Sequence, residues 1–332
     1  MTLGDAKMTV AGRVKKLNFK SGFSAVASIF ILLLMIKNSS LAYEVVVSAL
    51  KTCAGMLIPS LFPLMVASEI ATKTGAINLI GKRLLSPLAR LFGMSKTAVS
   101  PFLLGLVGGY TTSCTSAVHL YESGRITKRE CESIIALSGM PSMAFLSSFV
   151  GSTLFKNSTV GWIMWGATVV SSILCGILNR FHLLNKQRDA DAFSFPKAEK
   201  KSFSSIAIGA IIHSAYAMLT VCACVVFFSV LIELLSIALS QLGISGALSD
   251  TLLGALEITQ AVKYASSLTD TRLGIILTAF YVGWSGLSVH FQTIALCDGC
   301  GLSFKRYFLL KAIQGALSAV LIALSVDLLF KF

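Results

Sequence analysis

Two apolar stretches, one in each half of the chain, give way to glycine, hydroxyl and amide residues, and each precedes an interrupted membrane-length segment. The first pair is residues 104–114 and the break at 138–142; the second is residues 253–261 and the break at 283–288. Broken backbone leaves amide and carbonyl groups that lipid cannot satisfy. Paired interruptions in corresponding halves point to a transporter binding site. The repeat therefore predicts a transport site at the breaks.

The composition indicates a membrane protein. Of 332 residues, 55% are hydrophobic and 13% are charged, and the mean hydropathy is +0.80. Soluble domains carry about 25% charged residues, so a soluble fold could not hide this apolar surface. The net charge of +13 is spread over short loops between apolar segments, as expected where basic residues set topology. We therefore expect a polytopic membrane protein that does not bind nucleic acid.

Segments of about 20 apolar residues are needed to span a bilayer, and fewer suffice where the bilayer thins. Two stretches, 97–123 and 247–268, read as apolar, polar and apolar again, which fits a re-entrant helical hairpin better than a full span. Residues 77–92 are amphipathic and basic. The candidate crossings are residues 22–37, 55–72, 130–152, 159–181, 215–240, 273–296 and 306–329.

The distribution of basic residues supports re-entrance. With a cytoplasmic N-terminus, most of the 28 lysines and arginines, Lys311 among them, fall on the cytoplasmic side. This is a strong positive-inside bias, and treating either hairpin as a full span would invert every later loop. The exceptions are Lys37, Lys51, Lys156, Lys263, Arg272 and Lys331.

We expect an all-α polytopic membrane protein of two inverted repeats. Each repeat has three transmembrane helices, one of them broken, plus a re-entrant hairpin, and an extra transmembrane helix precedes them. Residues 1–50 would contain the basic cytoplasmic N-terminus, this extra transmembrane helix and an amphipathic segment. We expect the helix to be retained and not cleaved as a signal peptide. Residues 51–184 form the first repeat, 185–202 a cytoplasmic linker, and 203–332 the second, inverted repeat. Residues 203–213 would lie on the membrane surface.

The candidate substrate-binding residues are glycine, hydroxyl, aromatic and amide residues at the hairpins and breaks. Such residues line wet cavities where a helix is broken. The alternative is that they let membrane helices pack closely. They are Gly109, Tyr110, Thr111, Thr112, Ser113, Ser138, Ser142, Thr259, Gln260, Ser285 and Ser288.

Two ionisable residues are candidates for a coupling ion or proton. Glu257 lies within the second hairpin, and an acid inside a membrane segment is functional by default because burying it is costly. The alternative is a glutamate that ties two helices together. His290 follows the second break and could relay a proton near neutral pH, or could be a hydrogen-bonded structural histidine. Glu69 and Glu233 lie near the ends of crossings, where placing a carboxylate costs little free energy, so they are weaker candidates.

The sequence contains no motif that predicts an enzyme. It has no phosphate-binding loop, paired catalytic carboxylates or nucleophile elbow. The Cys297-Asp298-Gly299-Cys300 pair has no second ligand cluster, so we expect no metal site. We expect no cofactor other than a coupling H+ or Na+.

Four short motifs resemble a known family. They are residues 59–63 (PSLFP), 105–114, 254–259 (GALEIT) and 286–292 (GLSVHFQ). In this order they resemble the sporulation integral membrane proteins of the YlbJ/SpoVV type, which contain two nucleoside-recognition Gate domains related to concentrative nucleoside transporters. The resemblance implies the fold of that transporter core. It also implies a location in the cell membrane, or in a forespore-surrounding membrane, of a spore-forming bacterium, and a role in moving dipicolinate into the spore.

The chain departs from this family at the predicted site. The family usually reads Gly-Tyr-Pro-x-Gly-Ala in the first hairpin, whereas Tyr110 is followed here by Thr-Thr-Ser-Cys. The third crossing also lacks an asparagine-rich lead into its break. We expect a transporter of a small polar or anionic solute, dipicolinate-like or nucleoside-like, working by alternating access in the lipid bilayer. The alternative is a non-transporting scaffold for spore maturation. The sequence leaves open whether the protein forms a homo-oligomer.

Overall fold

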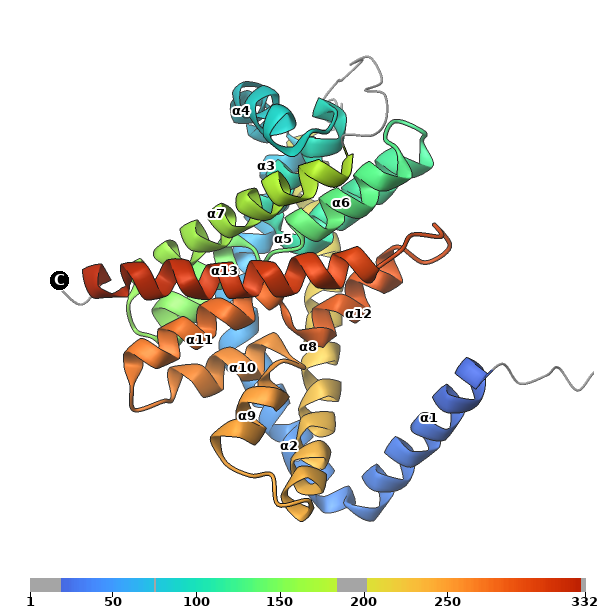
Figure 1. Ribbon diagram of the computed structural model, residues 1–332, viewed down its shortest axis with the longest axis vertical. Coiled ribbons are helices and arrows are strands. Elements are labelled where there is room, and N and C mark those ends of the chain that lie inside the picture. The colour runs from blue at the N-terminus through green and yellow to red at the C-terminus, as the bar shows by residue number, and fades with distance from the viewer. Residues whose placement is uncertain (1–18, 75, 184–201, 330–332) are drawn as a thin grey trace, which may run out of the picture. The chain divides into compact units, whose positions relative to one another are not determined.

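The computed structural model describes residues 19–74, 76–183 and 202–329, and in these ranges the regular elements are helices without a strand (Figure 1). The chain forms two compact units, Met1–Glu44 and Val45–Phe332. The predicted basic N-terminus, up to residue 18, and nearly all of the predicted linker 185–202 lie outside the described residues. The all-helical fold class is confirmed for the described ranges.

The described part of the first unit contains α1 (Phe19–Lys37) and the first turns of α2 (Ser39–Thr52). The side chain of Asn38, between the two helices, donates a hydrogen bond of 2.9 Å to the Leu34 carbonyl oxygen. Apolar residues such as Ile36, 63% exposed, cover the surface of α1. This pattern fits a helix whose neighbour is lipid.

The first half of the second unit begins with the end of α2, a π-helical turn η1 (Cys53–Leu57) and α3 (Ile58–Lys73). The amphipathic α4 (Ala76–Phe92) and α5 (Lys96–Glu122) follow. The segment Arg83–Phe92 is bent by 112° from Lys96–Glu122. The predicted domain boundary after residue 50 falls inside α2.

A broken helix and a long helix complete this half. They are α6 (Lys128–Ser138), η2 (Phe145–Leu154) and α7 (Ser158–Leu183). Thr127 and Glu130 form a reciprocal capping box at the start of α6, which fixes where the helix begins. Residues 139–142, here called the first break, are not helical. Pro141 lacks an N–H and disfavours a helical residue before it, so the helix ends here.

The described part of the second half consists of six helices. Its helices are α8 (Phe203–Gln241), α9 (Ala247–Gly254), α10 (Ile258–Ser266), α11 (Thr271–Trp284), α12 (Gly286–Leu296) and α13 (Lys305–Leu329). The chain leaves helical geometry at Ser285, and Ser285–Gly286 is here called the second break. Residues 203–213 form the first turns of the continuous α8, and the stretch contains no proline to end it. Their location on the membrane surface stays a prediction.

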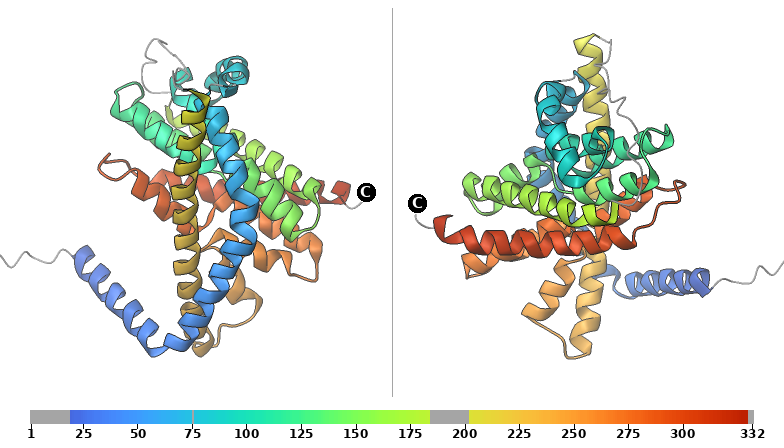
Figure 2. Two further views of the ribbon diagram at one scale, coloured as in Figure 1. Left: turned by 180° about the vertical axis from the view of Figure 1, so that it is seen from behind. Right: turned by 45° about the horizontal axis from the view of Figure 1, so that its top comes forward.

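Close backbone approaches hold the long helices together. A Cβ atom added to Gly283 of α11 would lie 2.7 Å from the Cα atom of Gly315 in α13. A Cβ added to Gly161 of α7 would lie 2.2 Å from the Leu146 carbonyl oxygen in η2. Small residues of this kind let membrane helices pack without a hydrophobic driving force. Figure 2 shows α13 against α11 and α7, and α8 running beside α3.

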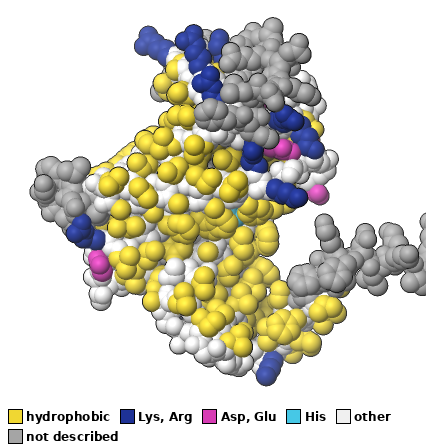
Figure 3. Space-filling view, in the orientation of Figure 1, with side chains coloured by type: hydrophobic (Ala, Val, Ile, Leu, Met, Phe, Trp, Pro, Cys, Tyr) yellow, Lys and Arg dark blue, Asp and Glu magenta, His cyan; other side chains and the backbone are white. Residues whose placement is uncertain are grey.

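Five helices in the described ranges are long and apolar enough to cross a membrane, or six if the bent pair of α4 and α5 counts as one span. They include five of the predicted crossings; the other two coincide with shorter apolar helices, Ser28–Lys37 and Phe145–Leu154. Hydrophobic side chains cover most of the face in Figure 3, and Lys and Arg side chains gather near α4 and α6. The chain is a multi-pass membrane protein.

Candidate functional site

The chain folds back on itself at Gly109, inside α5. Gly109 has φ 77° and ψ −171°, far from helical values. A Cβ added to Gly105 would lie only 3.0 Å from the Cβ of Ser113, whereas eight residues of straight helix span about 12 Å. The two arms of α5 therefore lie against each other, and we call α5 the first hairpin, with its tip at residues 108–111.

The tip of the first hairpin packs on the first break. A Cβ added to Gly109 would lie 3.1 Å from the backbone nitrogen of Ser142. Ser113 donates a hydrogen bond to Ser138, which in turn donates to the Ile134 carbonyl. Both serines are fully buried. Glycine is needed at position 109 because a positive φ and a close backbone approach coincide there.

The second hairpin, α9 and α10, packs on the second break in a similar way. The backbone nitrogens of Leu287 and Ser288 donate to the carbonyl oxygens of Ala255 and Leu256, at 3.1 and 2.9 Å. These contacts place the turn between α9 and α10 against the start of α12. The turn ends in Glu257, which caps α10 by accepting a hydrogen bond of 2.8 Å from the Gln260 backbone nitrogen. A carboxylate at a helix N-terminus is favoured by the helix dipole.

The two breaks touch each other. The Ser285 hydroxyl donates a hydrogen bond of 3.2 Å to the Gly139 carbonyl oxygen. Ser285 has φ 77°, a left-handed conformation that is costly for a residue other than glycine. Such strain persists only where the surroundings hold it, often at functional sites. The contact between the breaks is one of several that join the two halves of the chain.

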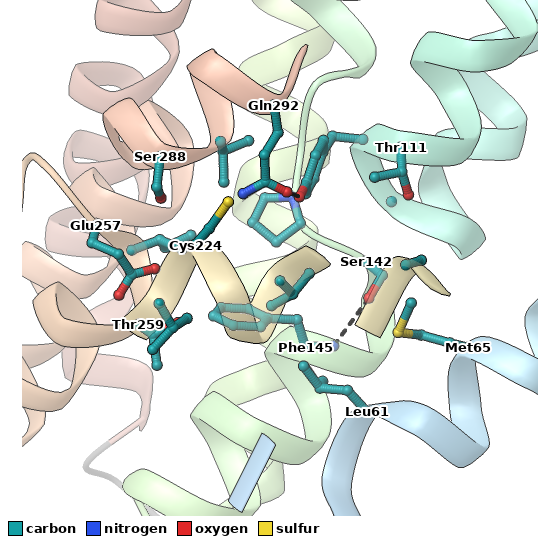
Figure 4. Close-up of a pocket in the computed structure, with 18 of the residues that line it drawn as sticks. Leu61, Met65, Thr111, Ser142, Phe145, Cys224, Glu257, Thr259, Ser288 and Gln292 are labelled. Atoms are coloured by element: carbon teal, nitrogen blue, oxygen red, sulfur yellow. Dashed lines mark hydrogen bonds between the residues drawn. The ribbon is translucent and has the colours of Figure 1, made fainter. Parts of the chain in front are cut away.

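A cavity of about 750 Å³, including its open mouth, lies between the hairpin tips and the breaks. In Figure 4, Glu257 and Thr259 face Thr111 and Ser142 across it, with Phe145 between them. Its lining comes from α3, both hairpins, the first break, η2, α8 and α12. The lining residues are Leu61, Met65, Gly108, Gly109, Tyr110, Thr111, Pro141, Ser142, Phe145, Ala217, Val221, Cys224, Val225, Glu257, Ile258, Thr259, Ser288, Val289 and Gln292.

A smaller cavity of about 370 Å³ adjoins the first. The two share Met65, Gly108, Thr111, Ser142 and Ala217 in their walls. The smaller one also contains Glu69, whose carboxylate lies 3.2 Å from the Lys73 ammonium and 3.4 Å from the His213 ring. It therefore extends the first cavity past the first hairpin toward charged side chains.

The chemistry of the larger cavity is mainly apolar with a few polar groups. Glu257, 2% exposed, is the one acidic or basic side chain among the described residues that line it. The N-termini of the neighbouring half-helices are already capped: the Phe145 nitrogen donates to the Ser142 hydroxyl at 3.2 Å, and the Gln260 nitrogen to Glu257. The cavity thus has no cationic side chain among these residues to balance a dianion.

The structure brings seven of the thirteen predicted site residues to this cavity. They are Gly109, Tyr110, Thr111, Ser142, Glu257, Thr259 and Ser288. Thr112 lines the smaller cavity. Three other predicted residues form hydrogen bonds within the protein instead: Ser113 bonds Ser138, and Ser285 bonds the Gly139 carbonyl. The Gln260 side chain donates to the Ser229 hydroxyl of α8 at 2.7 Å, so it ties the second hairpin to α8.

His290 lies outside both cavities, in an aromatic cluster. Its Nδ1 is 2.8 Å from the Tyr307 hydroxyl, and its ring is 4.5 Å from that of Trp284 and 5.1 Å from that of Phe308. Its Nε2 is buried with no hydrogen-bond partner among the described residues. These contacts favour the structural histidine over the proton relay.

Twelve of the nineteen lining residues were not among the predicted site residues, and three of them matter most to the site. Gln292 of α12 accepts a hydrogen bond from the Tyr110 hydroxyl. Its position in the GLSVHFQ motif was the available signal. Cys224 of α8 and Phe145 of η2 also line the cavity. Cys224 lies in uninterrupted apolar sequence, which carries no sign of a site, and Phe145 is an apolar residue three positions after the first break.

Lys311 was counted among the basic residues on the cytoplasmic side, whereas the structure buries it inside a helix. It lies within α13, is 0% exposed, and donates hydrogen bonds of 2.5 Å to the Gly139 carbonyl and 2.8 Å to the side-chain oxygen of Gln314. The helix starts at Lys305 and turns Lys311 inward, a consequence of helical geometry. Read as a basic run, Lys305, Arg306 and Lys311 gave no sign of this.

The chain is similar over most of its length to a known protein. It is 24% identical over 334 aligned residues to the sporulation integral membrane protein YlbJ of Bacillus subtilis (strain 168), covering 90% of this chain and 81% of that protein. No protein-family model matches the chain, and no solved structure matches it. The similarity supports a YlbJ-type protein and agrees with the multi-pass arrangement of apolar helices.

Proposed function

We propose that this protein is a membrane transporter that moves a small polar organic solute by alternating access, with the larger cavity as its binding site. The observation that carries the proposal is the convergence of both hairpin tips, the first break and the start of α12, just after the second break, on one cavity that contains Glu257. Irregular backbone at membrane depth is tolerated where it lines a cavity, and transporter sites are built from such discontinuous helices.

The proposed topology is a pair of inverted repeats. From α3 to α7 and from α8 to α13 the order is a long helix, a hairpin, a broken helix and a long helix, with α4 as an additional helix in the first half. With three crossings and one re-entrant hairpin in each, the second copy is inverted relative to the first. The N-terminus lies in the cytoplasm, and the hairpins enter from opposite sides of a bacterial cell membrane or, during sporulation, of a forespore-surrounding membrane.

The cavity favours one class of solute. Its apolar wall, formed by residues such as Phe145 and Val289, suits a flat organic ring. Its polar groups, with Glu257, suit a solute that carries hydrogen-bond donors, as a nucleoside does. A dianion such as dipicolinate has no cationic side chain to meet among the described lining residues. We infer that an anionic solute enters together with a proton or a cation.

The test is uptake by the purified chain in proteoliposomes against nucleosides, dicarboxylates and dipicolinate, with and without H+ and Na+ gradients. We expect uptake of one class, and a loss of about 10- to 100-fold in Glu257→Gln, because hydrogen bonds to a charged group contribute about 1.5–3 kcal/mol. Gln keeps an oxygen to cap α10. Glu233→Gln, in α8 outside the cavity, is the matched control and should transport normally.

The alternative to a transporter is a membrane scaffold for spore maturation. The similarity to YlbJ is equally consistent with a membrane scaffold that moves no solute. Absence of uptake of every solute by folded protein, with normal spore maturation in cells that carry Glu257→Gln, would favour the scaffold.

A further inference from the structure

A buried cation lies where the two breaks meet. Lys311 is fully buried in α13, and its ammonium contacts the Gly139 carbonyl and the Gln314 side chain. Within the described ranges no carboxylate lies within ion-pair distance of it. Burying an ammonium without a counter-ion is costly in a protein interior and in a membrane. A leucine or methionine would fill the same place without this cost, so the amine and its two hydrogen bonds are the feature that needs a function.

The partner of this cation is an end of a broken helix. Gly139 directly follows α6, whose last carbonyl groups lack helical partners. Carbonyl groups at a helix C-terminus carry partial negative charge and favour a cation. In discontinuous membrane helices such carbonyl groups coordinate the Na+ or H+ that drives transport. The Gly139 oxygen also accepts the Ser285 hydroxyl, so the cation and both breaks share one atom.

We propose that the Lys311 ammonium is a resident cation of the transport site, held on the Gly139 carbonyl where a discontinuous helix would otherwise bind a metal cation. Lys311 is then a positioning residue: it acts through the first break, whose Pro141 and Ser142 line the cavity. Solute binding and transport consequently require no Na+, and removal of the ammonium leaves a place for an external cation.

The inference rests on the proposed transport function, so its test uses two readouts. The first is uptake in proteoliposomes with NaCl or choline chloride. The second, which needs no substrate, is the midpoint of thermal unfolding in detergent in the same salts and in methylammonium chloride. The variants are Lys311→Ala, Lys311→Arg and, as the control on the same helix, the exposed Lys305→Ala. If neither wild type nor any variant takes up solute, but the unfolding midpoints depend on the cation as expected in the next paragraph, the result counts against transport and not against the resident cation.

We expect wild type and Lys305→Ala to take up solute equally in Na+ and choline, and to unfold at the same temperature in both. Lys311→Ala should lose at least about tenfold of its uptake in choline, with partial recovery in Na+ or methylammonium, and these cations should raise its unfolding midpoint. Lys311→Arg should retain Na+ independence. If Lys311→Ala does not fold, the comparison of wild-type protein in Na+ and in choline still tests the proposal.

Either of two results would overturn the proposal. One is a wild-type protein whose uptake or unfolding midpoint rises with Na+. The other is a Lys311→Ala variant that matches Lys305→Ala in choline in both readouts.

Discussion

The hydroxyl of Tyr110, at the tip of the first hairpin, donates a hydrogen bond to the side-chain oxygen of Gln292 on α12. These residues are 182 positions apart in the chain and belong to different halves. Both line the larger cavity. The bond therefore closes the cavity wall between the first hairpin and the second broken helix.

A double-mutant cycle should detect this bond. Tyr110→Phe and Gln292→Leu each remove one partner, and we expect a coupling free energy of about 0.5–1.5 kcal/mol, the usual net worth of a hydrogen bond. Chemical denaturation of the detergent-solubilised protein, followed by fluorescence, would measure it. Tyr281→Phe, paired with Gln292→Leu, is the control, since the Tyr281 hydroxyl bonds the Thr251 carbonyl instead. A coupling energy near zero for the first pair would contradict the contact.

Gly109→Ala should destabilise the protein. At φ 77° and ψ −171° Gly109 lies in a region that only glycine readily adopts, where an alanine costs about 1–3 kcal/mol. The alanine Cβ would also press on the Ser142 backbone. The matched control is Gly166→Ala in α7, where an added Cβ meets nothing within 4 Å. That change should stabilise by up to about 1 kcal/mol, because alanine is the better helix former. Thermal unfolding of both variants in detergent measures the difference, and equal midpoints would refute the fold-back at Gly109.

The inverted arrangement makes a prediction about sidedness. Ser123 follows the first hairpin and Ser267 follows the second, and both are exposed. In the proposed topology these equivalent positions lie on opposite sides of the membrane. A membrane-impermeant maleimide should label Ser123→Cys only from the cytoplasmic side and Ser267→Cys only from the other. Labelling of both from one side would rule out inversion.

The local interruptions could be predicted from the sequence, because their causes are local. Gly109, Pro141 and Gly286 either require or permit backbone that a helix cannot adopt, and the sequence displays them directly. The partners of the predicted polar residues could not be predicted. Ser113 and Ser138 bond each other, and Ser285 bonds the other half, which depends on distances between segments far apart in the chain.

The buried lysine illustrates the same limit more sharply. Lys311 follows Lys305 and Arg306, so charge alone counts all three on the cytoplasmic side of the membrane. Its burial depends on α13 starting at Lys305 and on the Gly139 carbonyl being free to accept it. The apolar part of the cavity, including Phe145 and Cys224, is likewise a product of packing. Sequence reasoning found the polar edge of the site and missed its apolar wall.

The most direct test of the central claim uses the native Cys224, which lines the cavity from α8. Its comparison is Cys222, similarly half-buried on the same helix but outside the cavity lining. Each would be kept in a background with the other cysteines replaced by serine, treated with a small thiol reagent, and assayed for uptake. We predict that modification of Cys224 abolishes uptake and that transported solute slows its labelling, whereas Cys222 shows neither effect. Full uptake after complete modification of Cys224, or labelling unchanged by saturating solute, would contradict a solute site in this cavity.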